Sequence, residues 1–171
     1  MFYGVSLGRS FDSSAGYFEL GASSKRLSGS LQYGFITTHL KQDTLYLTPI
    51  MMQITAKTGR IGRIRGIVGG GLGWAFTDYD LDRQTLKYDE MRGYRVETYV
   101  DPAPIYKVTG GIECFLDHFS IVFSLSEFFF DSKFHYNREN VRTLRPFWLN
   151  DPVKAVNLDF LVGYLGVRYY Y

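Results

Sequence analysis

Residues 64–77 read IRGIVGGGLGWAFT, and their side chains divide between two faces. Successive side chains of a β-strand point to opposite faces, so residues two apart share a face. The pattern predicts an amphipathic strand with one apolar face and one face of small or polar residues. The apolar face carries Ile64, Val68, Leu72, Trp74 and Phe76, and the other carries Arg65, Gly69, Gly71, Gly73, Ala75 and Thr77.

The same alternation recurs along the whole chain, whereas helical periodicity is weak. It breaks at Glu127, where three phenylalanines follow, and again near residues 160–163. We expect a β-bulge at Glu127, because one extra residue would restore the phase. The predicted strands cover residues 2–10, 16–23, 28–39, 44–57, 63–78, 103–115, 119–133 and 155–171.

The connections between these segments alternate in length. Short turns occur at 24–27, 58–62 and 116–118, whereas two long polar connections cover 79–102 and 134–154. Membrane barrels have short periplasmic turns and longer extracellular loops, and an even strand number places both termini on the periplasmic side. The sequence therefore predicts an all-β fold, an eight-stranded antiparallel up-and-down transmembrane β-barrel, with residues 1–171 as a single domain.

Composition narrows the function classes. Aromatic residues make up 18% of the chain, yet the mean hydropathy is only −0.11, which suits strands with one apolar and one polar face. The net charge of +2 comes from scattered residues, so nucleic acid is not an expected partner. No apolar run approaches the roughly 18 residues of a transmembrane helix.

Export to an outer membrane needs a signal segment, but residues 1–8 already alternate like a strand. Either a signal precedes Met1 in the full protein, or the export interpretation is wrong. An alternative is a soluble lipocalin-like barrel, whose apolar face points inward. Against it, the polar face is rich in Gly, Ser and Thr and poor in charge, which suits a narrow lumen. Aromatic residues also gather at the strand ends, as in membrane barrels.

Two segments carry a family resemblance. Residues 66–76 resemble the glycine-rich central strand of the small outer-membrane β-barrel superfamily, which includes the outer-membrane protein A, X and W types. Residues 161–171 are similar to its closing strand, and residues 45–50 and 100–102 look most like the W type. The resemblance implies outer-membrane lipid and lipopolysaccharide as surroundings, the barrel assembly machinery as a partner, and passage or binding of small hydrophobic molecules. It also implies an assembly signal at Gly166, Tyr169 and Tyr171.

Charged residues fall on the polar faces of several strands. Arg65 and Glu113 lie near the periplasmic ends of adjacent predicted strands, and both face inward, so they are a candidate ion pair. Glu19, Lys107 and Arg168 also face inward in this phase. We interpret the five as a charged network that holds the lumen closed; a gate or solute path is the alternative.

The last long connection is unusually apolar, and its residues Leu144, Phe147, Trp148 and Leu149 either cap the barrel mouth or contact a hydrophobic ligand or partner. We favour the cap.

We predict no catalytic residue, no cofactor and no metal site. Residues 135–137 look faintly like the motif of lipid A deacylases, an enzymatic alternative, but Asn137 stands where the nucleophilic serine would be. Residues 78–82 begin like a calcium loop, but Arg83 replaces its glycine.

Overall fold

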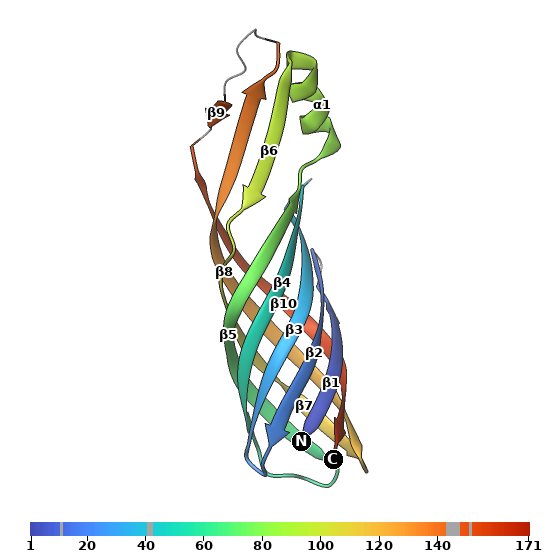
Figure 1. Cartoon of the computed structure of the whole chain (residues 1–171). Helices are drawn as coiled ribbons and strands as arrows, with labels where there is room; N and C mark the ends of the chain where they lie inside the picture. The colour runs from blue at the N-terminus through green and yellow to red at the C-terminus, as the bar shows by residue number, and fades with distance from the viewer. Residues whose placement is uncertain (11, 41–42, 143–147, 151) are drawn as a thin grey trace.

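The computed structural model describes residues 1–10, 12–40, 43–142, 148–150 and 152–171; the side chains of residues 40 and 148–150 lie outside this description. The chain forms ten strands and one helix within these ranges (Figure 1). They are β1 (Phe2–Arg9), β2 (Ser13–Ser23), β3 (Leu27–Leu40), β4 (Asp43–Lys57), β5 (Ile64–Asp80), α1 (Arg83–Arg92), β6 (Tyr94–Val100), β7 (Ala103–Leu116), β8 (Phe119–Asn140), β9 (Trp148–Asn150) and β10 (Lys154–Tyr170).

Eight of these strands close into a barrel in the order β1-β2-β3-β4-β5-β7-β8-β10, with every neighbouring pair antiparallel. The last strand, β10, pairs with β8 on one side and with β1 on the other, which completes the ring. Each of the eight predicted segments corresponds to one barrel strand. The predicted eight-stranded antiparallel barrel is confirmed. No helix in the described ranges is long and apolar enough to cross a membrane.

The two faces of the wall differ as the alternation predicts. Outward positions of every barrel strand carry exposed apolar side chains, and many inward positions are polar and buried. A soluble ligand-carrying barrel would have the reverse arrangement. One outward example from each strand is Leu7, Leu20, Leu31, Met52, Leu72, Val108, Leu125 and Leu165, and inward examples are Ser6, Glu19, Gln32, Thr55, Glu113, Ser126 and Arg168.

The glycines of β5 let neighbouring strands approach closely. Gly73 faces inward, and a Cβ atom added there would lie only 2.1 Å from the carbonyl oxygen of Ile50 on β4. Real Cβ atoms do not come this close, so a larger residue would push the two strands apart. The glycine-rich pattern therefore reflects a narrow, tightly packed wall.

The predicted β-bulge at Glu127 is wrong, and so is the predicted slip near residues 160–163. β8 pairs with both β7 and β10 without interruption through this region. Phe128 and Phe130 point inward and are 1% exposed, while Glu127 points outward and is exposed. The strand stays regular. The interior changes from polar to apolar at this level, so apolar side chains point inward and a polar side chain points outward.

The barrel has two different ends (Figure 1). We call the end that carries both termini and the short turns the turn end, and the opposite end the loop end. At the loop end β8 continues beyond the barrel and pairs with β6 on one side and β9 on the other. Helix α1 lies beside β6; Asp82 caps its start by accepting a hydrogen bond from the N–H of Gln84, at 2.9 Å, and Gly93 ends it. The two long connections thus hold secondary structure that the sequence analysis did not predict.

Candidate functional site

The lower half of the lumen, toward the turn end, holds a network of charged side chains. Arg65 and Glu113 are direct partners in the pairing of β5 with β7, and Arg65 Nη2 lies 2.6 Å from Glu113 Oε2. The other oxygen of this fully buried carboxylate accepts hydrogen bonds from the hydroxyls of Ser120, at 2.6 Å, and Tyr170. Glu113 therefore has every partner that a buried carboxylate requires.

A second ion pair joins β10 to β2. Arg168 donates to both carboxylate oxygens of Glu19, and its Nη1 lies 3.8 Å from Glu113 Oε1. Gly4 on the intervening β1 is opposite both residues, and it has no side chain to come between them. The two ion pairs are thus linked through Arg168.

Lys107 ends the network at the level where the interior becomes apolar. Gln32 donates to Glu19 Oε2 at 3.2 Å and accepts from Lys107 Nζ at 3.2 Å. The ammonium group also lies 4.3 Å from the centre of the Tyr17 ring, a cation–π contact. Within the described ranges Lys107 has no carboxylate partner at ion-pair distance. The structure thus brings all five charged residues of the predicted network together across the lumen. Gln32 joins Lys107 to Glu19, and Ser120 and Tyr170 donate to Glu113; these three polar partners were not predicted from the sequence.

Above this network the lumen is apolar and filled. Phe128 stacks on Phe160 with ring centres 5.2 Å apart, and Tyr17 packs against Tyr164 at 5.1 Å. Buried aliphatic side chains from β3, β4 and β7 complete the cluster; they include Ile36, Leu45, Leu47, Met51 and Ile105.

The barrel wall has a notch beside this apolar cluster. β1 pairs with β10 only at residues 163–170, so the upper part of β10, residues 154–162, has a described partner only on its β8 side. A cavity of about 380 Å³ lies there, between β10 and the ends of β2 and β3. The inward-facing Leu158 and Phe160 line it and also pack against the apolar cluster. The notch therefore lies directly beside the apolar cluster. The rest of its lining is mostly polar: Ser10, Asp12, Ser13, Thr38, His39 and Asp159.

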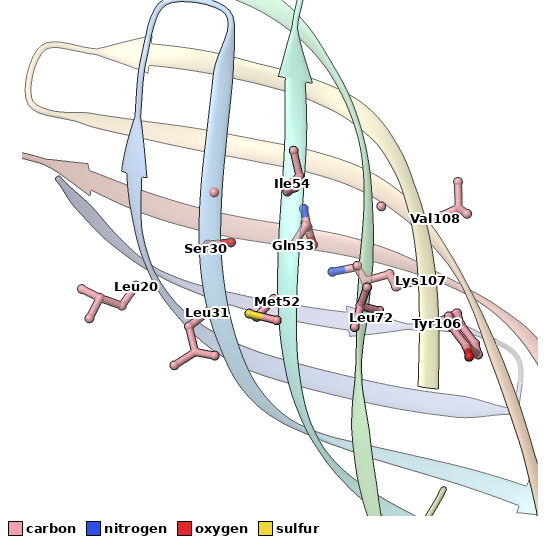
Figure 2. Close-up of a pocket in the computed structure, with 13 residues that line it drawn as sticks. Leu20, Ser30, Leu31, Met52, Gln53, Ile54, Leu72, Tyr106, Lys107 and Val108 are labelled. Carbon is pink, nitrogen blue, oxygen red and sulfur yellow. The ribbon is translucent and has the colours of Figure 1, made fainter. Parts of the chain in front are cut away.

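A larger hollow of about 850 Å³ lies in the outer wall across β2, β3, β4, β5 and β7 (Figure 2). Its floor includes Gly29 and Gly70; a Cβ atom added to Gly29 would meet nothing within 4 Å. Leu20, Leu31 and Leu72 are among the exposed apolar side chains that surround it. The hollow is a trough in the apolar outer surface.

His135 lies on β8 beyond the barrel. Its Nε2 is 3.1 Å from a carboxylate oxygen of Asp101, and its ring stacks on Tyr99 at 4.4 Å. Asp101 can therefore orient the His135 ring, a contact that was not predicted from the sequence. No hydrogen bond joins His135 to a hydroxyl group in the part of the chain that the structure describes, so no nucleophile accompanies the pair there. The same part holds no cluster of three or more metal-ligating residues.

The three residues of the predicted assembly signal lie on β10 and just after it. Gly166 is buried, and a Cβ atom there would lie 2.0 Å from Ser6 Oγ. Tyr169 faces outward, where its ring packs against Tyr3 at 5.5 Å and against the highly exposed Tyr171 at 5.2 Å. The three tyrosines form an aromatic group at the turn end.

The predicted mouth cap falls largely outside the described residues. Leu144 and Phe147 are not described, and Trp148 and Leu149 are described only as the backbone of β9. The cap stays a prediction.

Solved structures with this fold are outer-membrane proteins. Outer membrane protein OprG from Pseudomonas aeruginosa matches over 99% of this chain and 96% of its own, with a TM-score of 0.55 and 10% sequence identity. Neisserial surface protein A matches over 99% and 95%, with a TM-score of 0.62 and 9% identity. Outer membrane protein AlkL, solved in lipid bilayers, matches over 98% and 88%, with a TM-score of 0.55 and 11% identity. No protein-family model and no curated protein sequence matches the chain. The chain has the fold of small outer-membrane β-barrels.

Proposed function

We propose that this chain spans the outer membrane and admits small hydrophobic molecules through the notch beside β10. The observation that carries the proposal is the unpaired upper edge of β10 next to an apolar interior. A ligand in the notch would contact Leu158 and Phe160 on one side, and bilayer lipid would lie on the other. Its volume of about 380 Å³ suits a small molecule.

The membrane location is supported by the outer surface and by the fold. Apolar side chains cover the outward face of all eight barrel strands, and each of these strands pairs with both of its neighbours over at least part of its length, so outside the notch few backbone groups would face lipid unpaired. In such barrels the short turns are periplasmic, so the turn end would face the periplasm and the loop end the outside. Lipopolysaccharide would surround the loop end, and the barrel assembly machinery would insert the chain. The W-type resemblance agrees with a hydrophobic cargo.

The charged network argues against a continuous water-filled pore. Its members are buried and joined by hydrogen bonds across the lumen, and the apolar cluster fills the space above them. A hydrophobic molecule would therefore pass sideways through the notch, beside the apolar cluster, instead of crossing the barrel along its axis. The network is structural in this proposal.

Two measurements test the proposal. The purified chain should fold only in detergent or lipid and should migrate faster on a gel before heating than after; a monomer that is soluble without detergent would contradict the membrane location. In lipid vesicles, the fluorescent probe N-phenyl-1-naphthylamine should bind at the notch. Leu158→Glu should weaken this binding at least about tenfold, because the carboxylate must be desolvated beside the apolar cluster. The matched control is Asn157→Glu at the adjacent outward position, which should bind as the wild type does. Equal binding by both variants would refute the notch.

A further inference from the structure

The turn end holds a vestibule lined by cations, which neither the charged network nor the notch accounts for. A cavity of about 640 Å³ lies between the β2–β3 and β4–β5 turns. These turns and the ends of their strands lie at the lower end of the barrel in Figure 1. The charged residues that line the cavity are Lys25, Arg26, Lys57, Arg60 and Arg65.

None of the described residues that line this vestibule carries a carboxylate. Arg65 is paired with Glu113, which Arg168 also approaches, so this carboxylate is already shared by two arginines. Within the described ranges, the other four cations have no ion-pair partner. Lys57 is mostly buried, and its ammonium group donates only to the Ser23 hydroxyl and, at 3.4 Å, to the Ser24 carbonyl oxygen. Cations that converge without counter-charge repel one another, and an anion between them would relieve this repulsion.

Two of the guanidinium groups are held in place by one aromatic ring. The Cζ atoms of Arg60 and Arg65 lie 4.6 Å and 4.3 Å from the centre of the Phe115 ring. Arg60 is fixed further by a 2.8 Å hydrogen bond from its Nε to the carbonyl oxygen of Gly62. Both groups keep N–H donors free for a ligand. Planar guanidinium groups bind phosphate oxygens in a bidentate manner, and less order is lost on binding when they are already positioned.

We propose that the vestibule binds a phosphate-bearing anion. Several cations around one enclosed space suit a group with more than one negative charge and several acceptor oxygens, as phosphates have. Clustering in a cavity, instead of along a stripe, argues against a nucleic acid. The phosphate could belong to the headgroup of an anionic phospholipid in the inner leaflet or to a free phosphate compound in the periplasm. This site lies at the opposite end of the barrel from the notch, and binding of a lipid headgroup rests on the proposed membrane location, whereas binding of a soluble phosphate in micelles does not.

The test uses the full chain folded in uncharged detergent micelles and in lipid nanodiscs. In micelles, isothermal titration calorimetry measures binding of pyrophosphate at low salt. In nanodiscs of phosphatidylcholine with and without phosphatidylglycerol, mass spectrometry measures which lipid stays bound to the released protein. The variant is Arg26→Gln/Arg60→Gln, whose side chains lie on exposed turns and take no part in the charged network. The matched control is Arg83→Gln/Lys87→Gln on α1, which removes the same charge at the loop end.

The wild type and the control should bind pyrophosphate, phosphatidylglycerol or both, and the variant should bind at least about tenfold more weakly. Retention of phosphatidylglycerol alone would identify a lipid headgroup, and binding of pyrophosphate alone would identify a soluble anion. The gel shift on heating verifies that each protein is folded, and the single substitutions Arg26→Gln and Arg60→Gln should each give a part of the loss. The proposal is overturned if the wild type binds neither probe, or if the variant and the control bind equally.

Discussion

Arg168 and Glu19 lie on β10 and β2, two strands that are not neighbours, and their side chains meet over Gly4 of the strand between them. Arg168 also approaches Glu113 on β7, across the lumen. The last strand of the chain thus supplies the residue that joins both ion pairs. The network is complete only when β10 has closed the barrel, so the closing step also satisfies the buried charges.

Glu19→Gln should destabilise the folded barrel strongly. The substitution leaves Arg168 without its closest counter-charge in a buried position, and losing one partner of a buried ion pair costs about 3–5 kcal/mol. Urea unfolding of the protein in lipid vesicles measures the loss. Glu97→Gln on the exposed face of β6 is the control and should change the free energy of unfolding by less than about 0.5 kcal/mol. Equal effects of the two substitutions would mean that the pair does not stabilise the barrel.

The double variant Glu19→Gln/Arg168→Gln should lose less stability than the sum of its two single substitutions, because it leaves neither charge unpaired. Strict additivity in the same unfolding measurement would show that the two residues are not coupled.

Much of this barrel could be predicted from local pattern alone. Alternation with period two does not depend on which strands are neighbours, so it located all eight barrel strands and gave the inward direction of Glu19 and Arg168. The partner of Arg168 was not predicted, because Glu19 lies two strands away and the two side chains meet only across Gly4, which has no side chain. The Arg65–Glu113 pair could be predicted from the sequence, because its two residues lie on strands that are adjacent in the predicted barrel.

Two other features were missed for different reasons. The inward Phe128 and Phe130 break the alternation expected for an interior that is polar along its whole length. Helix α1 has almost no apolar face, so its periodicity is weak, yet Asp82 and Gly93 bracket it as an N-cap and a C-cap. Those two capping residues are the features of the sequence that indicate the helix.

Gly166→Ala should destabilise the barrel through a steric clash. The added Cβ atom would lie 2.0 Å from Ser6 Oγ on the neighbouring β1. We expect a loss of about 1–3 kcal/mol in urea unfolding, and Ser6→Gly in the same chain should restore most of it. Failure of Ser6→Gly to rescue would locate the effect of Gly166 elsewhere.

Tyr171→Ala should separate assembly from stability. The Tyr171 side chain is 81% exposed and its ring packs against Tyr3 and Tyr169, so the free energy of unfolding in vitro should change by less than about 1 kcal/mol. If Gly166, Tyr169 and Tyr171 form the assembly signal, the amount of this variant inserted in the outer membrane of cells should fall severalfold. The two readouts are urea unfolding and the heat-modifiable band in membrane fractions. Normal insertion of the variant would contradict the signal.

Phe128→Ala should loosen the apolar cluster that separates the notch from the charged network. The side chain is 1% exposed and stacks on Phe160, which lines the notch. Removing a buried phenyl group leaves a cavity and costs about 3–5 kcal/mol, whereas Phe123→Ala on the outward face of the same strand should cost less. Because the cavity would adjoin the notch, the variant should still bind N-phenyl-1-naphthylamine, and larger hydrophobic probes should gain affinity. A variant that is as stable as Phe123→Ala, with unchanged preference for probe size, would show that Phe128 does not shape the apolar interior.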